Sequence, residues 1–315
     1  MSEFIDGTYI NAAGTRNYKL YVAATRRGEM PPLFVMLHGC DQDAADFAVG
    51  TRMNELAEEC HGVVLYPEQC RLVNPLGCWN WHDADHQSAD HGEPSLIAGM
   101  TRQVVAEYKI DPARVYVAGM SAGGAMAVIL GQEYPDLYAA VGVHSGVPSG
   151  AASDLLSALT AMSMGPMRAE SAPANARKRN RRCVPTIVFH GDQDTVIHPS
   201  NGNAVHIQAR RPKRRGSAAK SSAPSQSSKM LTPEGPDDRA FTRTLETRDG
   251  VPEAELWIVH GAGHAWAGGS PEGTYTDGDG PDASREMMRF FLQQRLDAAT
   301  TAGSVAPPDA CAPPH

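Results

Sequence analysis

The sequence predicts a single-domain α/β fold in which a mostly parallel central sheet is flanked by helices. Six short apolar runs occur along the chain, and their apolar residues are continuous rather than alternating. Continuous runs are typical of strands that are buried on both faces of a parallel sheet. Segments with apolar residues at three- and four-residue spacing lie between these runs. Alternating strands and helices require crossover connections, and this favours an α/β architecture.

The predicted elements can be placed by residue range. Residues 8–23 are expected to form an antiparallel hairpin at the sheet edge. The buried strands are expected at residues 33–37, 63–66, 115–120, 139–146, 186–189 and 255–259. Helices are expected at residues 52–60, 95–108 and 284–298. The last helix has a good start, because Asp282 and Ser284 both offer side-chain acceptors for an N-cap.

Residues 1–298 are expected to form the catalytic domain, with two flexible insertions at residues 162–182 and 209–238. The second insertion is of low complexity and has too few large apolar residues to offset the entropy of ordering it. The proline-rich residues 299–315 are expected to be a disordered tail. Basic runs at residues 177–182 and 210–215 suit either a solvated flexible face, which we favour, or a polyanion site.

Composition limits the classes of partner. The 315 residues are 42% apolar with a net charge of −8, and no run approaches the length of a membrane-spanning helix. We therefore expect no membrane partner, and no nucleic acid partner because a general basic field is lacking. The first residues carry no basic and apolar leader, which would make the protein cytoplasmic unless a leader has been removed. The six cysteines suit either buried thiols or disulfides that link Cys40 with the region between Cys60 and Cys78.

The strongest local motif is Gly119-Met120-Ser121-Ala122-Gly123, which follows one apolar run and opens another. The pattern G-x-S-x-G is typical of the nucleophile elbow of the α/β-hydrolase fold, a sharp strand-to-helix turn that exposes the serine above the sheet. Larger side chains at the flanking glycines would clash there, and the helix N-terminus favours developing negative charge. An ordinary turn of small residues is the alternative, but the strand before it and the helix after it favour Ser121 as a nucleophile.

A serine nucleophile needs a base, and the base needs an orienting acid, in the chain order Ser, Asp or Glu, His. Asp192 and Asp194 follow the fifth apolar run, at the sheet edge where α/β sheets place their sites. Asp194 is preferred because it has more reach, and Asp192 suits a turn cap. His260 and His264 follow the sixth run. The glycine-rich loop around His264 favours it as the base, whereas His260 suits a hydrogen-bonded strand end.

An oxyanion hole needs two backbone N–H groups, one from the residue after the nucleophile and one from the loop after an early strand. Ala122 follows Ser121 directly. The segment 37–42 follows the first buried strand, and Cys40 is its best candidate donor. The alternative for this segment is a plain turn at His38 and Gly39.

Five segments together allow a family to be recognised: LHGCDQDAADFAVGTRMNELAEE, CWNW, GMSAGGAMA, HGDQDTVIHPSN and HGAGHAWAGG. In their order and spacing they resemble the poly(3-hydroxybutyrate) depolymerase family of esterases, from about residue 9 to residue 296. The resemblance implies an extracellular-type serine esterase that cleaves short hydroxyalkanoate esters or short-chain polyesters. It places Ser121, Asp194 and His264 on the family's triad and Cys40 and Ala122 on its oxyanion donors.

The resemblance also implies an aromatic wall beside the acyl pocket, formed by Trp79, Trp81 and Trp266, with His38 as a further substrate-binding residue. Core packing is the alternative for these tryptophans. Neither a cofactor nor a metal is expected. The loop at residues 82–94 is rich in Asp and His and suits a divalent metal, but a polar surface loop is preferred.

Two other functions remain open at this point. The family resembles feruloyl and acetylxylan esterases, so a carbohydrate esterase is the alternative within enzymes. A non-catalytic hydrolase-like module that binds a polymer is the alternative from another class. The chain shows no recognisable domain for gripping solid polymer, which favours soluble oligomers or simple esters over crystalline polymer. The sequence leaves the oligomeric state open.

Overall fold

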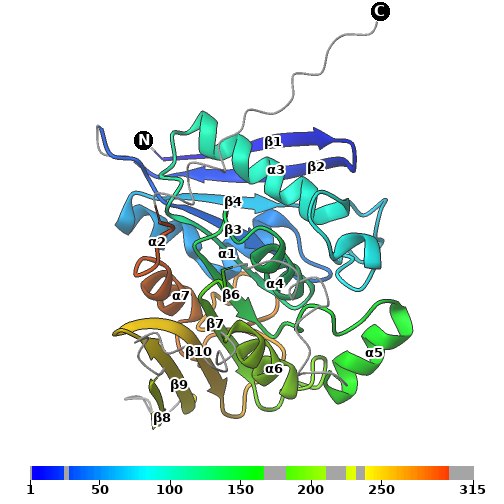
Figure 1. Ribbon diagram of the computed structural model, residues 1–315, viewed down its shortest axis with the longest axis vertical. Helices are drawn as coiled ribbons and strands as arrows, with labels where there is room; N and C mark the ends of the chain where they lie inside the picture. Colours follow the sequence, from blue (N-terminus) through cyan, green and yellow to red (C-terminus); the bar gives the residue numbers. More distant parts are fainter. Residues whose placement is uncertain (1, 25–27, 167–181, 211–224, 232–237, 298–315) are drawn as a thin grey trace, which may run out of the picture.

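The computed structural model describes residues 2–24, 28–166, 182–210, 225–231 and 238–297, which form one α/β domain around a ten-stranded sheet (Figure 1). The strands along the chain are β1 (Glu3–Asn11), β2 (Gly14–Val22), β3 (Leu33–Leu37), β4 (Val63–Pro67), β5 (Val115–Met120), β6 (Ala140–His144), β7 (Thr186–Gly191), β8 (Ser225–Leu231), β9 (Phe241–Arg248) and β10 (Val251–Val259). Their order across the sheet is β1-β2-β4-β3-β5-β6-β7-β10-β9-β8. The six strands from β4 to β10 in the middle of this order are parallel to one another, as predicted.

Antiparallel pairs close the sheet at both edges. β1 and β2 form the predicted edge hairpin, and β2 pairs antiparallel with β4. At the opposite edge β9 pairs antiparallel with β10, and β8 with β9.

Helices cover both faces of the sheet. Those of the described residues are α1 (Ala44–Thr51), α2 (Met53–Cys60), α3 (Gly92–Glu107), α4 (Ala122–Glu133), α5 (Leu155–Met164), α6 (Ser200–Ala209) and α7 (Ala283–Phe291), with a short 3-10 turn, η1 (Ala84–His86). One face is covered by α3, α4 and α6, and the other by α1, α2 and α7. A two-stranded ribbon of β11 (Trp266–Ala267) and β12 (Thr276–Asp277) lies outside the main sheet.

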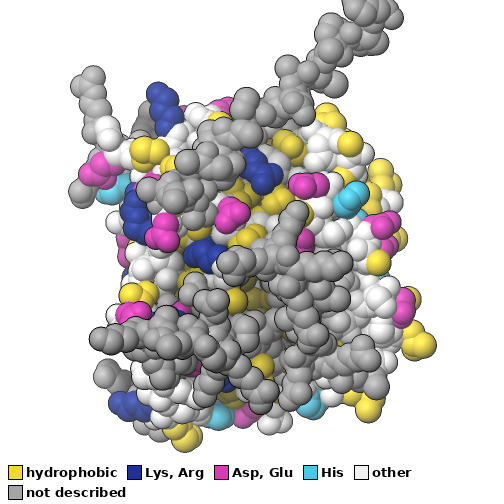
Figure 2. Space-filling model, viewed as in Figure 1, with side chains coloured by type: hydrophobic (Ala, Val, Ile, Leu, Met, Phe, Trp, Pro, Cys, Tyr) yellow, Lys and Arg dark blue, Asp and Glu magenta, His cyan; other side chains and the backbone are white. Residues whose placement is uncertain are grey.

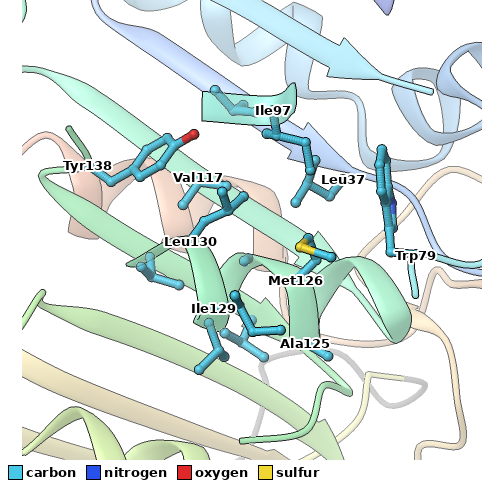
Figure 3. Packing of buried hydrophobic residues seen from close by; sticks show 14 of the residues in the cluster. Leu37, Trp79, Ile97, Val117, Ala125, Met126, Ile129, Leu130 and Tyr138 are labelled. Atoms are coloured by element: carbon cyan, nitrogen blue, oxygen red, sulfur yellow. The ribbon is translucent and has the colours of Figure 1, made fainter. Parts of the chain in front are cut away.

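The continuous apolar runs are explained by two separate hydrophobic cores, one on each face. Along β3, Val35 and Leu37 belong to the core under α3 and α4, whereas Phe34 and Met36 belong to the core under α2 and α7. Because successive side chains of a strand point to opposite faces, each strand has to be apolar throughout. Figure 3 shows the first core, in which Leu37 and Met126 lie on the same side of the cluster as Trp79.

The strand order determines where a site can form. From β3 the chain moves outward to β4 and then returns across β3 to β5, so the direction of winding reverses between β3 and β5. The carboxyl ends of two neighbouring parallel strands at such a reversal border a natural crevice for ligands. The segment that begins at His38 follows β3, and Ser121 follows β5.

The structure differs from the prediction at several elements. The last helix ends at Phe291 rather than at residue 298. Ser225–Leu231 lies within a predicted flexible insertion but forms β8, because backbone pairing with β9 holds it rather than burial. β9 was not predicted, because its sequence FTRTLETR is mostly polar and contains no continuous apolar run. The first predicted insertion starts too early, because residues 162–164 are the last turn of the helix that ends at Met164. Residues 167–181, 211–224 and 232–237 of the predicted insertions and the predicted tail, 299–315, lie outside the described residues.

The described members of the two basic runs make contacts within the protein. Arg182 donates to the carbonyl oxygens of Tyr138 (3.1 Å) and Ala139 (2.7 Å), and Arg210 pairs with Glu246 at 2.9 Å. On the face shown in Figure 2, basic and acidic side chains of the described residues are interspersed.

Candidate active site

Ser121 lies on the sharp turn between β5 and α4. Its backbone angles are φ 55° and ψ −118°, in a region that residues other than glycine rarely adopt. Its N–H donates to the carbonyl oxygen of His144 at 2.9 Å. A Cβ atom on Gly123 would lie 2.1 Å from the carbonyl oxygen of Leu37, and one on Gly119 would lie 2.4 Å from the backbone of Gly123. Only glycine therefore fits at these two positions against β3.

Asp194 is the buried carboxylate after β7. Its Oδ1 accepts the N–H groups of Val196 (2.9 Å) and Ile197 (2.8 Å), and its Oδ2 accepts Nδ1–H of His264 at 2.8 Å. Nε2 of His190 lies 3.4 Å from the same Oδ2. Burial raises the pKa of Asp194, but the hydrogen bonds from His190 and His264 together lower it by more. The pKa therefore lies well below its usual value. Asp194 is therefore ionised at neutral pH.

His264 stands in the loop after β10, beside the turn that carries Asp194. The two loops are joined through their backbones, since Gln193 N–H donates to the Ala262 carbonyl oxygen at 3.0 Å. Because Asp194 engages Nδ1, Nε2 is the ring nitrogen of His264 that is left for proton exchange. Among the hydrogen bonds of the described residues, none joins this Nε2 to Ser121 Oγ. Catalytic hydrogen bonds are often long in ligand-free enzymes and tighten with substrate.

The second Asp–His pair that the sequence offered also forms, but in another place. His260 Nδ1 lies 2.9 Å from Asp192 Oδ2, and Gly261 N–H donates to Asp192 Oδ1 at 2.8 Å. His260 Nε2 is engaged by Thr242 Oγ1 at 2.8 Å. Thr242 is on β9, which lies on the far side of β10 from β5, so this imidazole is occupied away from the nucleophile elbow.

His144 is a residue of the site that the sequence analysis missed. It ends β6 and is buried, and its Nε2 accepts the N–H of Ala267 at 3.0 Å. Burial, with the nearby His190 and His264, lowers the pKa of His144 to about 3, so the ring is neutral. Its carbonyl oxygen accepts the Ser121 N–H, and its side chain holds the loop that follows His264. The available signal was a histidine at the end of a buried run, which also suits a purely structural residue.

The two predicted oxyanion donors lie on the segments that meet at the elbow. A Cβ atom on Gly39 would be 3.6 Å from Ser121 Cβ, so the segment after β3 passes directly beside Ser121. In the described part of the chain, neither the Cys40 N–H nor the Ala122 N–H donates to another protein group. A disulfide joins Cys40 to Cys78, which settles one of the pairings that the sequence left open. Cys60 and Cys70 are free thiols.

The predicted contact of His38 with substrate stays a prediction, and the structure places this side chain inside the fold. The side chain is fully buried, its Nδ1–H donates to the Gly39 carbonyl oxygen at 2.8 Å, and its Nε2 accepts the Gln69 N–H at 3.1 Å. Burial lowers the pKa of His38, so it is neutral. Both ring nitrogens are used inside the fold.

The three predicted wall tryptophans are all buried. Trp79 and Trp266 are each 1% exposed and Trp81 is 7% exposed. Trp79 packs against the ring of His38, with centroids 5.6 Å apart, and Trp266 donates its Nε1–H to Ser284 Oγ at 3.0 Å. These contacts explain Trp79 and Trp266 as packing residues. Contact of the three tryptophans with substrate stays a prediction.

Residues 16–219, more than half of the chain, match the family model described as Esterase PHB depolymerase. The chain belongs to this family. The resemblance drawn from the five sequence motifs is thereby confirmed.

Among curated relatives, the poly(3-hydroxyalkanoate) depolymerase C of Paucimonas lemoignei is 32% identical over 177 residues, which cover 55% of this chain and 42% of the relative. The feruloyl esterase B of Neurospora crassa is 28% identical over 184 residues, which cover 54% of this chain and 61% of the relative. The chain thus spans about half the length of these relatives.

Among solved structures, an acetyl xylan esterase from Aspergillus awamori matches with a TM-score of 0.67 at 19% identity, over 93% of this chain and 99% of that one. This match shows that the family member has the predicted α/β-hydrolase fold.

Two further findings concern membranes and metals. None of the helices in the described segments is both long and apolar enough to cross a membrane. Within the same segments, no group of three or more His, Cys, Asp or Glu side chains is arranged to hold a metal ion. In the Asp- and His-rich loop, His86 Nδ1 accepts the Glu93 N–H at 2.8 Å, and Asp83 caps η1.

Proposed function

We propose that this member of the family is a serine esterase that hydrolyses short-chain hydroxyalkanoate esters. Ser121 is the nucleophile, His264 the general base and Asp194 the orienting acid. The observation that carries the proposal is the buried Asp194–His264 hydrogen bond of 2.8 Å, at the same end of the parallel strands as a serine held at φ 55°. Strained backbone of this kind is concentrated at functional sites.

The chemistry has two steps. His264 Nε2 removes the Ser121 proton while Oγ attacks the ester carbonyl, and the resulting oxyanion is bound by the N–H groups of Cys40 and Ala122. The alcohol leaves with the proton held by His264. Water then attacks the acyl-enzyme with His264 again as the base, and the acid is released. The proposed steps use no metal and no organic cofactor.

The substrate class rests on the relatives. The depolymerase from Paucimonas lemoignei supports a short hydroxyalkanoate polyester or oligomer, and the feruloyl esterase from Neurospora crassa supports a carbohydrate esterase of feruloyl or acetylxylan type as the second candidate. A polymer-binding module without activity is the alternative that explains fewer features of the site. A binder gains nothing from a strained serine and a buried Asp–His pair at the same edge of the sheet.

An extracellular location is part of this proposal, with the cytoplasm as the alternative. The Cys40–Cys78 disulfide supports it, because such bonds persist in oxidising compartments and are rare in the cytosol.

The test compares the wild type with Ser121→Ala in three assays. We expect the wild type to clear a suspension of amorphous poly(3-hydroxybutyrate), to hydrolyse a soluble butyrate ester, and to be labelled by a serine-reactive phosphonate. The variant should fold and do none of these. Hydrolysis of ferulate or acetylxylan without clearing would move the substrate to the second candidate. Substantial ester hydrolysis by Ser121→Ala would overturn the assignment of the nucleophile.

A further inference from the structure

A buried carboxylate lies behind the oxyanion segment. Glu93, near the start of α3, is 1% exposed. Its Oε1 accepts from Arg16 (3.2 Å), from Asn80 Nδ2 (2.8 Å) and from Gln69 Nε2, and its Oε2 accepts the Asn80 N–H at 2.8 Å. Arg16 is itself 5% exposed and balances the charge. The donors come from three separate segments: β2, the turn after β4, and the loop that contains the CWNW motif.

One path from Glu93 reaches the oxyanion segment through its backbone. Gln69, whose side chain is held by Glu93, donates its backbone N–H to His38 Nε2 at 3.1 Å. The acceptor role of Nε2 leaves the proton on His38 Nδ1, which donates to the Gly39 carbonyl oxygen at 2.8 Å. This carbonyl and the Cys40 N–H belong to one trans peptide and point in opposite directions. Fixing the Gly39 oxygen therefore fixes the direction of the Cys40 N–H.

A second path reaches the same residue through its side chain. Cys40 is joined to Cys78 by the disulfide, with the two Cα atoms 4.3 Å apart. The Cys78 carbonyl oxygen accepts Gln69 Nε2–H at 2.9 Å, and Asn80, two residues further on, is held at both its backbone and its side chain by Glu93. Both restraints on Cys40 thus end on the same carboxylate.

We propose that Glu93 is a positioning residue for the oxyanion hole. It does not touch substrate but holds the Cys40 N–H in the orientation that binds the oxyanion, through Gln69 and His38 on one side and the Cys78–Asn80 backbone on the other. The proposal rests on the proposed serine esterase function. A carboxylate suits this role because its two oxygens accept all four of these hydrogen bonds and donate none.

A matched variant separates the positioning role of Glu93 from a contribution to the stability of the fold alone. Glu255 on β10 is also fully buried and accepts from Arg243, Arg289 and the Trp257 indole. Its partners lie on β9, β10 and α7 rather than on the oxyanion segment. Glu93→Gln and Glu255→Gln both put an amide where buried donors expect an acceptor, so both should lower the thermal midpoint of the full chain.

The two variants are then distinguished by steady-state hydrolysis of a soluble butyrate ester, measured well below the thermal unfolding midpoints of both. We expect Glu93→Gln to reduce kcat by about 10- to 100-fold with KM within about threefold, because the oxyanion is bound only in the transition state. Glu255→Gln should keep kcat within about twofold. Equal kcat values for the two variants would overturn the positioning role, as would a change confined to KM.

If Glu93→Gln does not fold, Gln69→Met carries the same test. It removes the side-chain link between Glu93 and the Cys78 carbonyl while keeping the backbone N–H that His38 needs, and the same selective loss of kcat is expected. Wild-type activity equal to that of Ser121→Ala would instead overturn the proposed function and this role with it. An active wild type with an unimpaired Glu93→Gln overturns the positioning role alone.

Discussion

The proposed acid can be tested by changing one atom of Asp194. In Asp194→Asn, the remaining oxygen has to stay on the N–H groups of Val196 and Ile197, because an amide nitrogen cannot accept them. The new NH2 group then faces His264 Nδ1. His264 is forced to accept there and to carry its proton on Nε2, so it cannot take the proton of Ser121.

The expected loss in kcat follows from this tautomer of His264. A triad with the wrong histidine tautomer loses about 10⁴-fold in kcat, which corresponds to about 5 kcal/mol of transition-state stabilisation. The fold should survive, because the shape of the side chain and its two backbone hydrogen bonds are kept. KM should change little, since the interaction that is lost acts on the chemical step.

Asp192→Asn is the matched control. It makes the same change in the other Asp–His pair, where His260 is engaged by Thr242. Steady-state kinetics on a soluble ester, with circular dichroism to confirm folding, should show this variant within about threefold of the wild type. A loss in Asp192→Asn with a retained kcat in Asp194→Asn would show that the acid and base have been assigned to the wrong pair.

Two further predictions concern stability. The pKa of His144 is about 3 in the fold and about 6.5 in an unfolded chain, so its contribution to stability is present above pH 6.5 and is lost as the pH falls toward 3, at about 1.4 kcal/mol per unit. Between pH 7 and pH 5 the free energy of unfolding in urea should therefore fall by about 2 kcal/mol more for the wild type than for His144→Gln, and equal slopes would contradict this. Replacing both Cys40 and Cys78 by serine opens a loop with a sequence separation of 38, which should cost about 4 kcal/mol in urea unfolding and also lower kcat. A loss of stability below about 1 kcal/mol would contradict the role given to this disulfide.

The sequence predicted the elements with strong local signals. The apolar runs of the six central strands reflect burial on two faces, and the elbow glycines reflect contacts so short that no other residue fits. The pairing of Asp194 with His264 was predictable only as a preference, because Asp192 and His260 occur in the same two loops. In the structure the two pairs are separate, since Asp194 is bonded to His264, whereas His260 of the other pair is also bonded to Thr242 on β9.

What the sequence could not predict depends on contacts between distant segments. His144, Gln69 and Glu93 carry no motif of their own, and each is also a plausible structural residue. The predicted substrate contacts of His38 and the tryptophans came from the family resemblance, which carries no information on burial. In the structure these side chains are buried, and the Trp266 indole donates to Ser284.

The strand order explains why a neutral histidine is found at the end of β6. The neighbours β5, β6, β7 and β10 place Ser121, His144, Asp194 and His264 along one edge of the sheet, so His144 stands between nucleophile and acid. In the proposed acyl transfer, His264 becomes a cation that Asp194 has to stabilise. A second positive charge on His144 would oppose that cation and weaken the field of Asp194. Burial keeps His144 neutral, and its ring can then accept the Ala267 N–H, which fixes the loop of the base without competing for the acid.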